Sequence, residues 1–136
     1  ALDAIKEARS LLVKAIQINP ETMNGSAYVT LGTLYYMAPK WPISFGDDKT
    51  AQEMLEAALQ INPNGIDSNY FYGDFLLSHD KTDEAIKYFE KAATSPARDN
   101  KLYADNQLRA EANLALKNAK ERKVNSSKGL FLSLFN

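Results

Sequence analysis

The sequence predicts an all-α protein built from antiparallel helical hairpins. The main evidence is a pattern of small and large apolar residues, Ala-x-x-x-Leu/Phe-x-x-Ala, that begins at Ala51 and returns 34 residues later at Ala85. A third copy begins at Ala8. A fixed period of this size is typical of stacked helical hairpins, because one hairpin cannot bury its apolar face alone. We therefore expect an α-solenoid.

A second pattern lies upstream of the two complete copies, where a large apolar residue precedes a glycine at Leu31-Gly32 and Tyr72-Gly73. Together the two patterns resemble the tetratricopeptide repeat family, in which an aromatic residue, Leu-Gly, a second aromatic residue, a small alanine and a large apolar residue follow in order. Asn69 stands in place of the first aromatic residue in the last repeat. The resemblance covers about residues 3–97. It implies closely packed hairpins that bind proteins rather than catalyse reactions. Each copy runs towards a closing proline: Pro20, Pro63 and Pro96.

The helices follow from apolar spacing of three to four residues and from the turn residues between them. We expect one domain over residues 1–124 that ends in a charged capping helix. The first helix matches the second half of a hairpin, so either the chain is trimmed or the uncovered face packs on a partner. The expected hairpin helices are 3–18, 26–37, 47–60, 67–78 and 82–94, and the capping helix is 102–123.

The connection between the second and third helices is longer than its counterpart in the next repeat. It contains two prolines and two aromatic residues, Trp41 and Phe45. Prolines limit the freedom of the chain and aromatic rings offer area for burial. We expect an ordered loop near the binding groove, with Trp41 or Phe45 packed on its own hairpin and with Asp47 or Asp48 capping the next helix.

Residues 125–136 read as a hinge followed by an apolar tail. The polar run from Asn125 to Gly129 is expected to be flexible, and the apolar residues after it fall at helical spacing. Exposed apolar segments of this kind mark interfaces or chain ends. We expect the tail to fold back on its own body, to be disordered, or to form a homodimer. Its apolar residues are Leu130, Phe131, Leu134 and Phe135.

The composition argues against several classes of function. The chain has no cysteine, a single histidine, His79, and a net charge of −1. No glycine-rich phosphate loop is present. We therefore expect no catalytic residues, no metal, no cofactor and no nucleic-acid partner. No run of about 18 apolar residues occurs, so no membrane span is expected. A hydrolase using Asp47, Asp48 and Asp74 is disfavoured, because helix capping explains the first two.

The resemblance also implies a concave groove lined by the first helix of each hairpin. It lacks the lysines and asparagines with which some family members hold the terminal carboxylate of a peptide. Asp74 is its one acidic residue and would prefer a basic ligand residue. The inward-facing residues, aligned on Gly32 and Gly73, are Val29, Thr33, Tyr36, Met37, Tyr70, Asp74 and Leu77, with Trp41 and Phe45 on the nearby loop.

The sequence thus predicts a non-catalytic module that binds a peptide or a partner protein in this groove. An alternative comes from the loop that contains Pro39, Trp41 and Pro42. This loop resembles that of bacterial extracytoplasmic helper subunits. Some such proteins associate with solute transporters, and here the apolar groove would hold a small hydrophobic ligand. The partner and the compartment, bacterial periplasm or cytoplasm, stay open.

Overall fold

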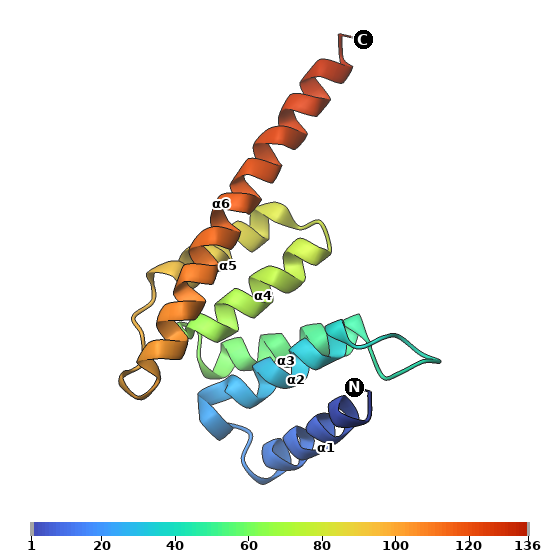
Figure 1. Cartoon of the computed structure of the whole chain (residues 1–136), viewed down its shortest axis with the longest axis vertical. Helices are drawn as coiled ribbons and strands as arrows, with labels where there is room; N and C mark the ends of the chain where they lie inside the picture. Colours follow the sequence, from blue (N-terminus) through green and yellow to red (C-terminus); the bar gives the residue numbers. More distant parts are fainter. Residues whose placement is uncertain (1, 136) are drawn as a thin grey trace.

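The computed structural model describes residues 2–135 and confirms an all-α repeat fold (Figure 1). Among these residues no β-strand is present, and a single isolated bridge joins Lys40 and Gly46. Ala1 and Asn136, which belong to the expected domain and tail, lie outside the described residues. The helices are α1 (Leu2–Ile18), α2 (Ser26–Met37), α3 (Asp48–Ile61), α4 (Ile66–Ser78), α5 (Thr82–Thr94) and α6 (Leu102–Ser133), with short 3-10 helices at Thr22–Gly25 and Asp99–Lys101.

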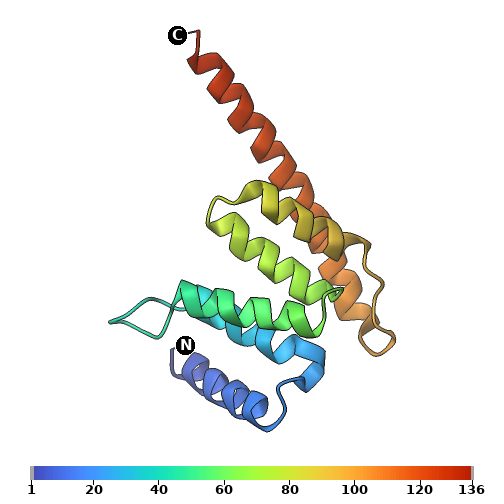
Figure 2. The same ribbon diagram turned by 180° about the vertical axis from the view of Figure 1, so that it is seen from behind.

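Consecutive helices pack against one another in chain order. The closest pairs are α2 with α3, α4 with α5, and α5 with α6, while α4 also touches α2 and α6. Figures 1 and 2 show the resulting stack, with α1 at one end and α6 at the other. Helices α2 and α4 begin at the same side of the molecule, and α6 begins beside them. The first helices of successive hairpins therefore form one continuous surface.

The core of each hairpin is made by the residues that define the repeat. Leu55 and Phe89 are completely buried, as are the alanines around them. A Cβ atom added at Gly32 would lie 2.8 Å from Cγ of Leu55, and one added at Gly73 would lie 2.7 Å from Cε1 of Phe89. These distances are too short for real atoms. Glycine is therefore required where the two helices of each hairpin cross.

Asn69 departs from the repeat pattern, which has an aromatic residue at this place. It is fully buried near the start of α4, and its Nδ2 donates hydrogen bonds to the carbonyl oxygens of Pro63 (2.9 Å) and Gly65 (2.7 Å). Its amide thus ties down the turn between α3 and α4. In this repeat, hydrogen bonds from Asn69 to two backbone carbonyl groups take the place of the packing of an aromatic ring.

An ion pair between a half-buried arginine and a buried aspartate fixes the turn that leads into α6. Asp105 is 2% exposed and accepts hydrogen bonds from the backbone N–H (2.8 Å), Nε (2.9 Å) and Nη2 (2.9 Å) of Arg98. The hydrogen bonds from the Arg98 side chain lower the pKa of the Asp105 carboxyl below its usual value. The sequence does not predict this pair, because its partners lie across an irregular turn with no recognisable spacing.

The expected hinge at residues 125–129 is wrong. Helix α6 does not end at Lys123 but continues without interruption to Ser133, over 32 residues. Asn, Ser and Gly lower helix stability by about 1 kcal/mol each or less, and none removes a backbone donor as proline does. Figure 1 shows that this last part of α6 projects beyond the other helices. All side chains from Val124 to Phe135 are exposed.

Substituting alanine for the two crossing glycines should destabilise the protein. Gly32→Ala and Gly73→Ala would each overpack a helix contact and lower the free energy of unfolding by about 1–3 kcal/mol, measured by urea denaturation. Gly129→Ala is the matched control, since nothing lies within 4 Å of a Cβ at Gly129. If Gly32→Ala and Gly73→Ala were as stable as Gly129→Ala, the tight crossings would be contradicted.

Asp105→Asn should destabilise the protein in a pH-dependent way. Because the folded pKa of Asp105 lies below its unfolded value, the charged carboxylate stabilises the fold above that unfolded pKa, about 4, and the contribution is lost as the pH falls through the folded pKa. We expect a loss of about 1–3 kcal/mol at pH 7 that shrinks below about pH 4. The exposed Asp99→Asn is the control. Equal stabilities of both variants at neutral pH would disprove the role of the pair.

Candidate functional site

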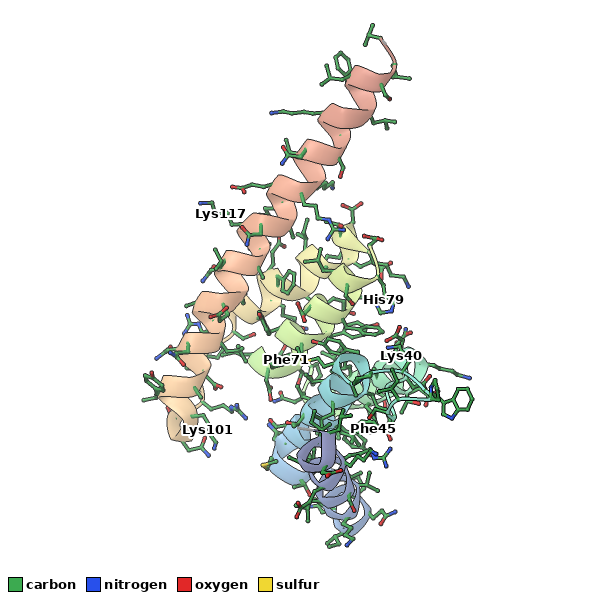
Figure 3. The ribbon with its side chains drawn as sticks, turned by 45° about the vertical axis from the view of Figure 1, so that its right-hand side comes forward. Lys40, Phe45, Phe71, His79, Lys101 and Lys117 are labelled. Carbon is green, nitrogen blue, oxygen red and sulfur yellow. The ribbon has the colours of Figure 1, made fainter. Side chains whose placement is uncertain are left out.

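The candidate site is the surface formed by neighbouring faces of α2 and α4, which we call the inner face. Although α2 and α4 pack against each other, the side chains of this surface are half-buried or exposed rather than fully buried. Figure 3 shows Phe71, on α4, between the first turns of α6 and the hairpin of α2. The inner face comprises Thr33, Tyr36 and Met37 of α2 and Tyr70, Phe71, Asp74 and Leu77 of α4.

A hydrogen bond joins the two repeats across the inner face. The hydroxyl of Tyr36 donates to Oδ2 of Asp74 at 2.7 Å, and the Tyr36 ring meets the Phe75 ring edge-on with centroids 5.7 Å apart. Burial raises the pKa of the Tyr36 phenol far above its usual value, and the bond to Asp74 raises it further. Tyr36 therefore stays protonated and remains a hydrogen-bond donor to Asp74.

Tyr70 forms the aromatic centre of the inner face. Its ring contacts Phe71 edge-on, with centroids 5.0 Å apart, and Phe89 at 5.9 Å. Burial raises the pKa of the Tyr70 phenol, and the charges of Asp74 and Glu111 add to the shift. Glu111 belongs to α6, so Tyr70 lies where α4 faces α6. Half-exposed tyrosine and phenylalanine give this surface large apolar area with a polar edge.

The structure corrects one residue of the expected groove. Val29 is only 3% exposed and packs in the main core, so its side chain does not reach the inner face. The reason is that the side chain is enclosed by core residues of α3 and α4. Thr33 uses its hydroxyl to donate to the Val29 carbonyl at 2.8 Å, while Met37 is 67% exposed at the end of α2. Leu77 is half-buried against the core.

A hollow of about 610 Å³ lies at the end of the inner face where α2, α4 and α6 begin. Ser26, for which the sequence predicts no binding role, lines this hollow and donates to Oδ2 of Asp67 at 2.6 Å. Figure 3 shows Lys101 at the start of α6 on the same side. Residues from three separate segments meet here, so no local sequence pattern could reveal the hollow. Its lining includes Met23, Ser26, Thr30, Asp67, Arg98 and Lys101.

The loop between α2 and α3 lies at the opposite end of α2 (Figure 1). Of its two aromatic residues, Phe45 packs on its own hairpin: its ring meets Tyr35 edge-on at 5.3 Å, and the guanidinium of Arg9 lies 4.3 Å from its centroid. Trp41 is instead 85% exposed. Figure 3 shows Lys40 and Phe45 on this loop. Of the two loop aromatic residues, only Phe45 therefore helps to anchor the loop.

The aspartates considered for hydrolysis have structural roles. Asp47 caps α3, accepting a hydrogen bond from the Thr50 backbone N–H at 2.9 Å, and this contact together with the Thr50 hydroxyl lowers its pKa. Asp48 pairs with Nζ of Lys40 at 2.7 Å and with Nε2 of His79 at 3.2 Å. Asp74 binds Tyr36. Among residues 2–135, no group of three or more His, Asp or Glu side chains is arranged to hold a metal ion.

Comparison with known proteins identifies the repeat directly. A tetratricopeptide repeat family model matches residues 66–97, which cover α4, α5 and the turn that follows them. Residues 66–97 therefore match a tetratricopeptide repeat, and the helices of the described residues form an all-α repeat stack around them. The family typically consists of non-catalytic modules that bind other proteins. No curated protein matches the chain. In the part of the chain that is described, no helix is long and apolar enough to cross a membrane.

Proposed function

We propose that the chain is a protein–protein interaction module that binds a peptide segment of its partner along the inner face. The observation that carries this proposal is the row of half-exposed aromatic side chains, Tyr36, Tyr70 and Phe71, that continues towards the hollow at the start of α4. Aromatic side chains contribute large contact area and few rotatable bonds, and they are enriched among the residues that dominate binding energy. The repeat fold supplies the rigid frame.

The charges on the inner face give a bound peptide a direction. Asp74 carries a carboxylate on the middle of α4 and would select a basic residue. Lys101 lines the hollow at the start of α4 and would select an acidic one, whereas the guanidinium of Arg98 is already paired with Asp105. Asp67 marks the position of the hollow on α4. It lies seven residues before Asp74, so the hollow is about 10 Å from Asp74 along the helix axis. A segment with one acidic and one basic residue spaced by this distance fits both ends.

The lining of the hollow argues against a small hydrophobic ligand, the alternative suggested by the loop resemblance. Asp67, Arg98 and Lys101 are charged, and charged groups lose hydration at a cost of several kcal/mol when an apolar molecule covers them. A polar peptide segment can pair with these groups instead. We therefore prefer a peptide ligand.

A random peptide library displayed on phage and selected on the full chain tests the binding proposal. We expect selected peptides with an acidic and a basic position, and with micromolar affinity as in small transient interfaces. Asp74→Asn keeps an acceptor for Tyr36 but removes the charge, and should weaken binding of peptides with the basic residue by about tenfold or less. Lys101→Ala should do the same for the acidic position.

Lys87→Ala, on the exposed surface of α5, is the control and should bind as the unmodified chain does. If all selected peptides bound Asp74→Asn and Lys101→Ala with unchanged affinity but lost affinity for Lys87→Ala, the binding face would lie on the other side of the molecule.

We also propose that the projecting end of α6 pairs with the same segment of a second copy. Leu130, Phe131 and Leu134 are 60–75% exposed on a helix that has left the body of the protein. Short helices without packing are marginal in water, so an apolar partner would stabilise this segment. The positive residues Lys120, Arg122 and Lys123 precede the apolar ones, so an antiparallel pair would keep like charges apart.

The double substitution Phe131→Glu with Leu134→Glu should convert such a dimer into a monomer, because it places charges in the apolar contact. Multi-angle light scattering of the full chain measures the mass directly. Ser133→Glu adds one charge on a different side of α6 and should leave the dimer intact. A full chain that is monomeric at the highest soluble concentration would refute self-association.

A further inference from the structure

The loop between α2 and α3 presents an exposed apolar tip that the fold itself does not use. Trp41 is 85% exposed and Ile43 is 68% exposed. We call these two residues the loop tip. Figure 1 shows the loop projecting from the stack of helices. A tryptophan contributes more stability by burial than almost any other residue, yet this one, the single tryptophan of the chain, is left in solvent.

The loop that carries this tip is held in place at its base. The backbone N–H of Gly46 donates to the Pro39 carbonyl at 2.9 Å, and that of Asp47 donates to the Tyr35 carbonyl at 2.9 Å. A Cβ at Gly46 would lie 2.0 Å from the Ala38 carbonyl oxygen, so the two ends of the loop are in direct contact. The Lys40–Asp48 ion pair and the Phe45–Tyr35 contact add further restraints. The tip is therefore presented by a fixed base.

We infer that the loop tip is a second protein-binding element, in which Trp41 inserts into an apolar pocket on a partner protein. A protruding tryptophan fits a pocket rather than a flat surface, and tryptophan is the residue most enriched among those that dominate interface energies. Because the loop is already ordered, little conformational entropy is lost when it docks. This element lies outside the inner face and does not depend on the peptide site there.

The charge of the loop decides between a protein pocket and a membrane surface. Exposed tryptophan also occurs at membrane interfaces, where basic residues beside it bind anionic lipid. Residues 37–48 contain one lysine against two aspartates, and Nζ of that lysine, Lys40, is already paired with Asp48 at 2.7 Å. Residues 41–46 carry no charged side chain, so the tip itself lacks the basic residues that bind anionic lipid. The chemistry fits an apolar protein pocket with an uncharged rim.

The test begins with a photo-reactive amino acid at position 41 of the full chain, expressed in the native host, and with the same group at position 87 as a control. A protein cross-linked at position 41 but not at 87 is identified by mass spectrometry and purified. It is then titrated into the unmodified full chain. We expect the Trp41 emission to move to shorter wavelength and Trp41→Ala to weaken the complex at least tenfold.

Two further variants separate this element from the inner face. Lys87→Ala and Asp74→Asn should both bind the identified protein as the unmodified chain does. Of these two variants, only Asp74→Asn should weaken the binding of peptides selected on the inner face. The inference is overturned if no protein cross-links selectively at position 41, or if Trp41→Ala binds the identified protein normally. It is also overturned if vesicles of equal parts phosphatidylcholine and phosphatidylglycerol alone shift the Trp41 emission, which would assign the tip to a membrane.

Discussion

The close crossing of two helices at a glycine is the constraint on which the rest of the structure depends. At Gly32 the side chain of Leu55, and at Gly73 that of Phe89, occupies the space that a Cβ would need. Both large side chains are fully buried as a result. Because each hairpin closes in the same way, α2 and α4 present equivalent faces. The inner face is therefore a consequence of the glycine crossings rather than a separate feature.

Contacts between the hairpins turn these equivalent faces into one surface. Tyr36 of the first hairpin donates to Asp74 of the second. At the start of the same two helices, Ser26 donates to Asp67. The Arg98–Asp105 pair then sets the path of the chain into α6, whose first turns close the hollow. Polar bonds fix the register of the repeats, while apolar burial supplies most of the stability. A bound peptide would meet a surface that is already formed.

The sequence was sufficient for the repeat fold but not for its irregular parts. The alanine and glycine spacing predicted the helix crossings, because small residues are needed wherever two helices approach closely. It could not predict that Val29 is buried, since that depends on the distance between hairpins. The Arg98–Asp105 pair and the hollow join residues from separate segments. The polar run from Asn125 to Gly129 predicts a hinge because its residues are weak helix formers, yet no proline interrupts the backbone hydrogen bonds and α6 continues through it.

Amide hydrogen exchange of the full chain, with and without a peptide selected on it, tests the central claim most directly. We predict that the peptide slows exchange in α2 near residues 33–37 and in α4 near residues 70–77, while α3 and α5 change little. Local protection of this kind reports where opening of the backbone is suppressed. Protection confined to α3 and α5, with α2 and α4 unchanged, would contradict binding at the inner face.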